Sequence, residues 1–217
     1  MNIFGYDTHK FPFKELIKNT FQEDDLEKIH EKYVYPTGRC TNLDNSNSVY
    51  HNRFYDKLRG GQHKFNDAYD RFITEVVSDI FKEEFIYQTV PTLRIHLVDN
   101  WATPEFHYDS QEGYNHPPGE INFIVPLTKC YGTNSLWVES SPGGGDFKPI
   151  VMNYGNLFMG NLNECLHGNK INRTSITRVT FDFRILPLSK YTPQKYTQSA
   201  TRGIKFEIGS YYKLPSL

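Results

Sequence analysis

The strictest pattern in this chain is an eight-residue stretch, residues 178–185, which reads Arg-Val-Thr-Phe-Asp-Phe-Arg-Ile. Its even-numbered positions are all polar, and its odd-numbered positions are all apolar. Successive side chains of a β-strand point to opposite faces of a sheet, so this alternation predicts a strand with one polar and one apolar face. It is the clearest of several strands that the sequence predicts after Pro91.

Other short runs in the second half of the chain also alternate, and clusters of turn residues separate them. Strands are predicted over 92–97, 121–127, 135–139, 149–154 and 157–159, and a further one over 205–212. Glycine-containing turns are predicted at 131–134, 141–145 and 168–170. Many short strands separated in this way predict a mainly β sandwich or jelly roll with helices on one outer face.

The first 90 residues have a helical periodicity instead. Between residues 66 and 85, apolar side chains recur at the i, i+3, i+4, i+7 spacing of an amphipathic helix, and a shorter helix is predicted around 23–33. Residues 35–63 are rich in Asn, Gly, Ser and Arg, so we expect a long loop that could serve as a lid. The chain is therefore predicted to be one domain, with a helical front (1–90), a jelly-roll core (91–187) and a tail packed on that core (188–217).

Size, charge and cysteine content limit the classes of function. A chain of 217 residues suits a single domain, and its formal net charge of −1 gives no field that would attract nucleic acid or an anionic membrane. No run approaches the roughly 20 apolar residues that span a bilayer, and the N-terminus lacks the pattern of a secretory signal. Cys40, Cys130 and Cys165 form no CxxC pair and are interpreted as reduced thiols. We expect a cytoplasmic protein with a small-molecule substrate and no nucleic-acid or membrane partner; the oligomeric state is not predicted.

A histidine and a carboxylate lie two residues apart at His107 and Asp109, and a second histidine follows at His167. Because residues i and i+2 of a strand point to the same side, His107 and Asp109 can bind one ion together. Two imidazoles and one carboxylate are the ligand set that holds Fe(II) on one face and leaves the other face open. The sequence therefore predicts a ferrous site at these three residues.

Arg178 lies eleven residues after His167, at the start of the alternating strand. Arg178 and Thr180 share the polar face of that strand, so a guanidinium and a hydroxyl can bind one carboxylate there. A planar, two-pronged donor suits the distal carboxylate of 2-oxoglutarate. We therefore expect a binding site for this cosubstrate next to the metal.

The sequence around these positions resembles that of a known superfamily. His-x-Asp, a distal histidine and an arginine eleven residues later are similar to the Fe(II)/2-oxoglutarate-dependent dioxygenases, especially their phytanoyl-CoA-hydroxylase-like branch. The flanking residues are similar in particular to the StrG-like group of streptomycin biosynthesis. The matching segments are 106–110, 114–123, 126–128, 134–140, 167–169 and 177–184.

The resemblance implies a double-stranded β-helix with iron at one mouth. His107, Asp109 and His167 would be the catalytic ligands, and Arg178 and Thr180 would bind 2-oxoglutarate. Three protein ligands on an octahedral ion leave two positions for the keto acid and one for dioxygen. The implied activity is hydroxylation with release of succinate and carbon dioxide. Halogenating relatives carry Gly or Ala in place of the carboxylate ligand, so Asp109 favours a hydroxylase.

Residues near the predicted site have more than one interpretation. Asn122 could hydrogen-bond the keto acid. Arg94 could touch cosubstrate or substrate, or it could form a structural pair with Asp182 or Glu120. Arg184, further along the alternating strand, is interpreted as structural.

The predicted substrate residues are His116, Tyr114 and Arg53, which belong to polar and aromatic loops. Such loops favour a sugar, a cyclitol or an amino-acid derivative over a lipid. Two other classes share the predicted roll: a cupin-type metalloenzyme and a sugar-binding jelly roll, both without 2-oxoglutarate chemistry. A cupin usually offers His-x-His plus Glu, which this segment lacks, and neither class needs Arg178. The oxygenase hypothesis therefore ranks first.

Overall fold

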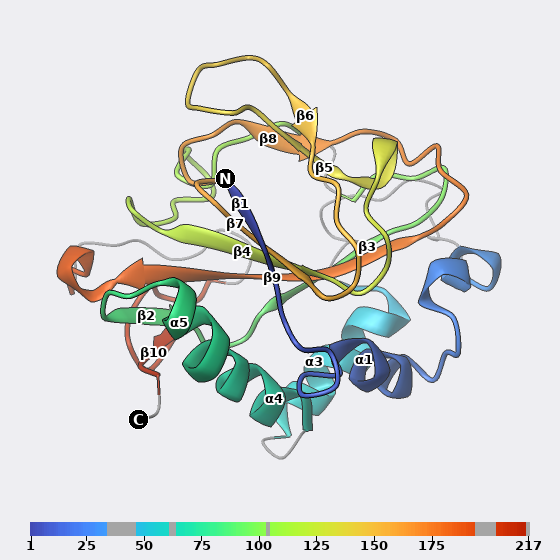
Figure 1. Cartoon of the computed structure of the whole chain (residues 1–217), viewed down its shortest axis with the longest axis horizontal. Helices are drawn as coiled ribbons and strands as arrows, with labels where there is room; N and C mark the ends of the chain where they lie inside the picture. The colour runs from blue at the N-terminus through green and yellow to red at the C-terminus, as the bar shows by residue number, and fades with distance from the viewer. Residues whose placement is uncertain (34–46, 61–63, 103–104, 194–202, 216–217) are drawn as a thin grey trace.

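The computed structural model describes residues 1–33, 47–60, 64–102, 105–193 and 203–215, and it forms three layers (Figure 1). A larger and a smaller antiparallel sheet face each other, and helices cover the outer side of the larger sheet. Within the described residues the larger sheet has seven strands in the order β1-β7-β4-β9-β2-β10, with β3 also paired to β9. These strands are β1 (Asn2–Gly5), β2 (Phe85–Gln88), β3 (Thr92–His96), β4 (Ile121–Pro126), β7 (Asn156–Gly160), β9 (Arg178–Pro187) and β10 (Tyr212–Lys213).

The smaller sheet has the order β6-β5-β8 in the described part of the chain. Its strands are β5 (Leu136–Val138), β6 (Lys148–Pro149) and β8 (His167–Asn169). Isolated bridges, His107 to His167 and Cys130 to Met152, continue its pairing beyond these strands. The mainly antiparallel β architecture with helices on one face confirms the predicted fold class at that level, although the strand predicted over 149–154 is reduced to β6 and one bridge.

Strand β9 is the centre of the molecule, and the strand predicted over 178–185 is confirmed. It pairs with β4 along one side and with β3 and β2 along the other. Its apolar residues belong to the main hydrophobic core, whereas its polar residues line a cavity. All ten residues are buried, so the polar face looks into the protein and not into solvent.

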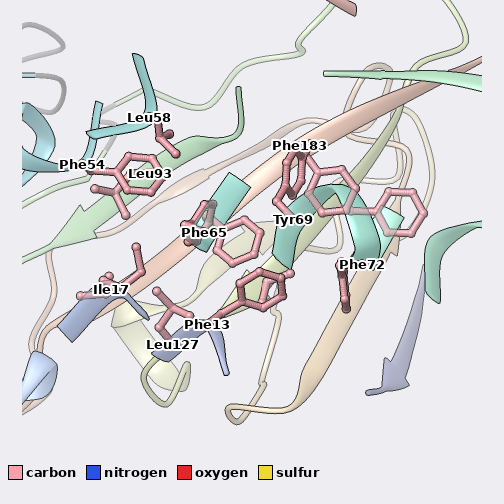
Figure 2. Packing of buried hydrophobic residues seen from close by; sticks show 14 of the residues in the cluster. Phe13, Ile17, Phe54, Leu58, Phe65, Tyr69, Phe72, Leu93, Leu127 and Phe183 are labelled. Carbon is pink, nitrogen blue, oxygen red and sulfur yellow. The ribbon is translucent and has the colours of Figure 1, made fainter. Parts of the chain in front are cut away.

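The helices bury an aromatic layer against the larger sheet (Figure 2). They are α1 (Phe13–Phe21), α3 (Val49–Arg59) and α4 (Lys64–Phe72). Phe181 of β9 meets the rings of Phe13 and Phe65 at centroid distances of 4.9 and 5.3 Å in edge-to-face geometry. Such pairs add to the stabilisation from apolar burial. The helical layer therefore fixes β9 from the face opposite the cavity.

The observed helices differ from the predicted ones at several points. The helix predicted over 66–85 is α4, a π-helical turn η2 (Ile73–Val77) and α5 (Ser78–Ile80), after which Phe85 begins β2. Pairing with β9 buries every residue of β2, and this tertiary contact overrides the helical periodicity. The helix predicted around 23–33 is a 3₁₀ helix, η1 (Leu26–Glu31). Helix α1 was not predicted.

The prediction of a loop over 35–63 is wrong for residues 49–59, which form α3 after the N-cap Ser48. The Ser48 side chain accepts a hydrogen bond from the His51 backbone, as a helix N-cap does. Residues 34–46 and 61–63 lie outside the described residues. The predicted helical front also contains β1, which pairs with β7 at the edge of the larger sheet.

Residues 203–215 of the tail lie against the larger sheet. β10 pairs with β2, and Phe206, Tyr211 and Tyr212 form a buried cluster with residues of β2 and β9. The strand predicted over 205–212 is confined to Tyr212–Lys213. Among the described residues, no helix has the length and apolar character that would let it cross a bilayer.

Candidate functional site

A cavity lies between the two sheets. Its polar lining comes mainly from β3, β4 and β9, and β8 contributes His167 and Asn169. Its volume is about 60 Å³, on a scale where a single water needs about 10–15 Å³. The cavity therefore has room for a small polar ligand.

His107, Asp109 and His167 all line this cavity and lie close to one another. Their ligand atoms all lie within 4.8 Å of one another. The Asp109 Oδ1 atom is 3.7 Å from His107 Nε2 and 3.6 Å from His167 Nε2. Neighbouring ligands of an octahedral ion with bonds of about 2.1 Å are about 3 Å apart. The three atoms thus surround a common point at nearly the spacing that one ion requires.

The two imidazoles present the same nitrogen to this point. His107 Nδ1 donates to the Glu105 carbonyl at 2.9 Å, and His167 Nδ1 donates to the Cys165 carbonyl at 3.0 Å. A carbonyl can only accept, so Nδ1 carries the proton and Nε2 keeps a free lone pair. Burial lowers the pKa of His107 to about 4 and also lowers the pKa of His167. Both rings are therefore neutral ligands at neutral pH.

Asp109 is the anionic member of this group of three, and its two oxygens have different surroundings. Asn122 Nδ2 donates to Oδ2 at 2.7 Å, and Arg184 donates to the same oxygen from Nε at 3.0 Å and from Nη2 at 2.8 Å. Oδ1 faces the two imidazoles. Burial by itself would raise the pKa of Asp109, but the charge of Arg184 and the neighbouring histidines together outweigh burial and hold this pKa well below its usual range. Two neutral nitrogens and one ionised oxygen fit a divalent ion such as Fe(II).

Arg178 lines the same cavity. Its side chain is only 4% exposed, and its Nη1 donates to the Asn134 carbonyl at 2.8 Å. Among the described residues no carboxylate comes within ion-pair distance of Arg178, and its Nε has no hydrogen-bond partner. Burial lowers the pKa of Arg178 to about 10, so the group is still charged at neutral pH. A buried cation without a nearby counter-charge is costly, so this guanidinium is a candidate partner for an anionic ligand.

Thr180 and Arg94 lie beside Arg178. They are direct partners in the β3–β9 register, and both line the cavity. Arg94 Nε donates to Asp182 Oδ1 at 2.8 Å, so the structural pair with Asp182 is the alternative that forms. The Arg94 side chain remains 31% exposed. It can therefore still meet a ligand with the rest of its guanidinium.

Asn122 and Arg184 both contact Asp109. Asn122 Nδ2 donates to Asp109 Oδ2, its Oδ1 accepts from the Leu162 backbone at 3.2 Å, and its contact with a keto acid stays a prediction. Arg184, which the sequence indicated as structural, donates directly to the metal-ligand candidate Asp109. Its place on the polar face of the alternating strand was the only sign in the sequence of this role.

The predicted substrate residues lie in different places. Tyr114 stacks on the ring of His107, with centroids 4.5 Å apart and an interplanar angle of 21°. His116 pairs with the buried Glu120 at 2.7 Å. Arg53 belongs to the helical layer, where it donates to the Phe21 carbonyl at the end of α1. Tyr114 thus contacts a metal-ligand candidate through its ring, and His116 does so through its backbone N–H, which donates to the Asp109 carbonyl at 3.1 Å.

Comparison with known proteins gives one extensive sequence match. The streptomycin biosynthesis protein StrG of Streptomyces griseus is 31% identical over 207 residues, which cover 95% of this chain and 94% of StrG. This chain belongs to the StrG family. The predicted similarity to the StrG-like group is thereby confirmed, whereas the phytanoyl-CoA-hydroxylase-like branch stays a prediction. No protein-family model matches the chain.

Solved structures similar to this StrG-family chain share little sequence with it. The nickel complex of the non-heme monooxygenase ThoJ is 13% identical with a TM-score of 0.46, and the match covers 94% of this chain and 80% of ThoJ. The non-heme alpha-ketoglutarate-dependent epimerase SnoN from nogalamycin biosynthesis is 10% identical with a TM-score of 0.48, over 74% and 75% of the two chains. Sequence identities of 13% and 10% do not assign the activities of these proteins to this chain.

Proposed function

We propose that this chain is an Fe(II)- and 2-oxoglutarate-dependent dioxygenase that hydroxylates a polar small molecule and releases succinate and carbon dioxide. The observation that carries the proposal is the meeting of two features in one cavity. One is the buried triad of His107, Asp109 and His167, with free Nε2 and Oδ1 atoms. The other is the buried Arg178, which lacks a carboxylate partner in the described part of the chain. A metalloenzyme that used no acidic cosubstrate would have no need of the second feature.

The protein residues divide the work between holding a metal and orienting a cosubstrate. His107, Asp109 and His167 would hold the ion on one face and leave its other positions to small ligands. When bound, a ferrous ion supplies the activation of dioxygen that couples oxidation of 2-oxoglutarate to oxidation of the substrate. Arg178 and Thr180 would bind the distal carboxylate of 2-oxoglutarate, so that its keto-acid end points along β9 toward the triad.

We further propose that the two sheets form a double-stranded β-helix of the phytanoyl-CoA-hydroxylase-like branch. The position of the cavity between two antiparallel sheets supports this, as does a lining drawn from both of them. The helical front would then be an outer cover of a single catalytic domain.

The substrate that we propose is a sugar, a cyclitol or an amino-acid derivative. The relative StrG is named for streptomycin biosynthesis, which favours a small molecule over a macromolecule. Tyr114 supports a polar ring compound, because its ring stacks on His107 at the metal-ligand candidates and is partly accessible. Release of succinate in the presence of candidate metabolites would identify the substrate.

The proposed cosubstrate site can be tested without a substrate. Anaerobic protein is titrated with Fe(II) and 2-oxoglutarate, and the weak visible charge-transfer band of the iron–keto-acid chelate is recorded. We expect the band in the wild-type protein. Arg178→Ala should need about 10–100 times more 2-oxoglutarate to develop it, because a charged hydrogen bond contributes about 1.5–3 kcal/mol.

The matched control is Arg173→Ala, since Arg173 is an exposed arginine that pairs with Asp99 away from the cavity lining. This variant should titrate like the wild type. A wild-type protein that binds Fe(II) but gives no band would contradict the proposal and favour a metalloenzyme without 2-oxoglutarate chemistry.

A further inference from the structure

Asp109 is held by two side chains that act on a single oxygen. Three donors converge on Oδ2: Asn122 Nδ2 at 2.7 Å, Arg184 Nη2 at 2.8 Å and Arg184 Nε at 3.0 Å. We call Arg184 and Asn122 together the Asp109 cradle. Because the cradle occupies Oδ2 fully, the carboxylate turns Oδ1 toward the two histidines.

The larger sheet builds this cradle. Asn122 of β4 and Arg184 of β9 are direct partners in the antiparallel register, so their side chains stand next to each other on the cavity face. They are 2% and 6% exposed, respectively. The Leu162 backbone donates to Asn122 Oδ1 at 3.2 Å and thereby fixes which end of the amide faces Asp109. The cradle is therefore a preorganised part of the sheet.

Two further carboxylates lie close to the Arg184 guanidinium. Its Nη1 lies 3.4 Å from Asp182 Oδ2, and its Nε lies 3.8 Å from the buried Glu120. These carboxylates give the guanidinium charge partners other than Asp109. We therefore expect the cradle to keep its geometry when Asp109 is replaced.

We propose that the cradle is an anion-binding site that restricts Asp109 to coordination through Oδ1 alone, with Arg184 as a positioning residue. This inference rests on the proposed function, because it requires that the triad binds a divalent ion. A carboxylate that bound through both oxygens would take one more position on the ion. Restriction to Oδ1 keeps that position for the small ligands that the proposed chemistry needs.

A variant that lacks the Asp109 carboxylate should leave the cradle without its anion. In Asp109→Gly the donors of Arg184 and Asn122 remain, and the space that they face is open. The cradle should then accept a small monovalent anion of the carboxylate class, and formate is the probe. A formate held there would present its second oxygen to an ion bound by His107 and His167.

The test measures Co(II) binding, followed by its visible absorption under anaerobic conditions, in the presence and absence of sodium formate. Asp109→Gly should bind Co(II) more weakly than the wild type, and formate should tighten this binding by about tenfold or more, within the 10–100-fold range of supporting interactions at metal sites. In Asp109→Gly/Arg184→Met, formate should have no such effect. Formate that tightens Co(II) binding equally in both variants, or in neither, would overturn the cradle.

Arg184→Met removes a buried cation that lies beside Asp182 and Glu120, so a second variant keeps the test independent of folding. Asn122→Ala removes one cradle donor and retains the charge of Arg184. We expect it to weaken Co(II) binding and to alter the Co(II) absorption spectrum, while its unfolding midpoint is checked by circular dichroism. An unchanged affinity and spectrum in a folded Asn122→Ala protein would contradict the role of the cradle. If the wild-type protein fails to bind Co(II), the proposed function is contradicted as well. If the wild-type protein binds Co(II) normally but the variants show no effect of the cradle, only the cradle proposal is contradicted.

Discussion

His96 lies opposite Arg178 in the pairing of β3 with β9, and both side chains are buried. The His96 Nε2 atom lies 2.8 Å from the Asn100 carbonyl. Burial and then the charge of Arg178 lower the pKa of His96 to about 3. His96 is therefore neutral at neutral pH and does not compete with Arg178 for an anionic ligand.

This buried histidine should make the stability of the metal-free protein depend on pH. Unfolded His96 takes up a proton below pH 6.5, whereas folded His96 does not until about pH 3. Since the unfolded state binds more protons in that window, the free energy of unfolding should fall as the pH drops from 6.5 toward 3. His96→Gln should remove about 2 kcal/mol of the loss between pH 6.5 and 5, at about 1.4 kcal/mol per unit. Urea unfolding at the two pH values measures this.

The control for this prediction is His9→Gln, because His9 is exposed at the surface. It should leave the pH dependence unchanged. A His96→Gln protein with the full wild-type loss would show that other groups are responsible.

At the scale of single residues, the sequence pointed to the metal-ligand candidates but not to the side chains that hold Asp109. His107 and Asp109 could be found because a two-residue spacing on an extended chain determines a shared side. Arg184 and Asn122 could not be assigned, since their role depends on which carboxylate lies across the cavity. That contact joins residues 75 positions apart in the chain, and no local spacing encodes it.

At the scale of elements, the two faces of β9 are expected to have different roles. The apolar face packs against the helices, and the polar face lines the cavity of the proposed cosubstrate site. Phe181 packs among Phe13, Phe65 and Tyr69 on the helical side. Phe181→Ala should therefore lower the free energy of unfolding by about 3–5 kcal/mol. Thr180→Val, one residue away on the cavity side, should weaken 2-oxoglutarate binding and change the free energy of unfolding by less than about 1.5 kcal/mol. Urea unfolding and the anaerobic titration measure the two effects.

A surface control for the stability measurement is Val151→Ala, because Val151 is 52% exposed. It should leave both quantities near the wild-type values. If Thr180→Val destabilised the fold as much as Phe181→Ala and left cosubstrate binding intact, the division between the faces would be wrong.

The elements also differ in how well their patterns predict them. Strands β3 and β9 could be predicted because each has one polar and one apolar face, even where the polar face lines an interior. The end of the long helix could not, since Phe81 and Phe85 continue the helical spacing after α5 ends at Ile80. Helix α3 escaped prediction because polar residues at Asn52, Arg53 and Asp56 obscure its buried face.

At the scale of the whole molecule, the metal-ligand candidates join parts that are distant in sequence. His167 belongs to β8 of the smaller sheet, and Asp109 is held by the cradle on β4 and β9 of the larger sheet. An ion bound between them would link the two sheets. Since the unfolded chain has no such preformed site, the free energy of metal binding should add to the free energy of unfolding of the whole protein.

The expected size of this effect follows from mass action. A metal at 100 times its dissociation constant should add about 2.7 kcal/mol to the free energy of unfolding. For a domain of this size that corresponds to an increase of about 5–10 °C in the thermal midpoint. Co(II) should produce this increase in the wild type and in Asp99→Ala, which changes an exposed carboxylate, but not in Asp109→Ala. Equal increases of the thermal midpoint in the wild type and in Asp109→Ala would mean that the ion binds elsewhere. Loss of the increase in Asp109→Ala alone would mean that the metal links the two sheets at His107, Asp109 and His167.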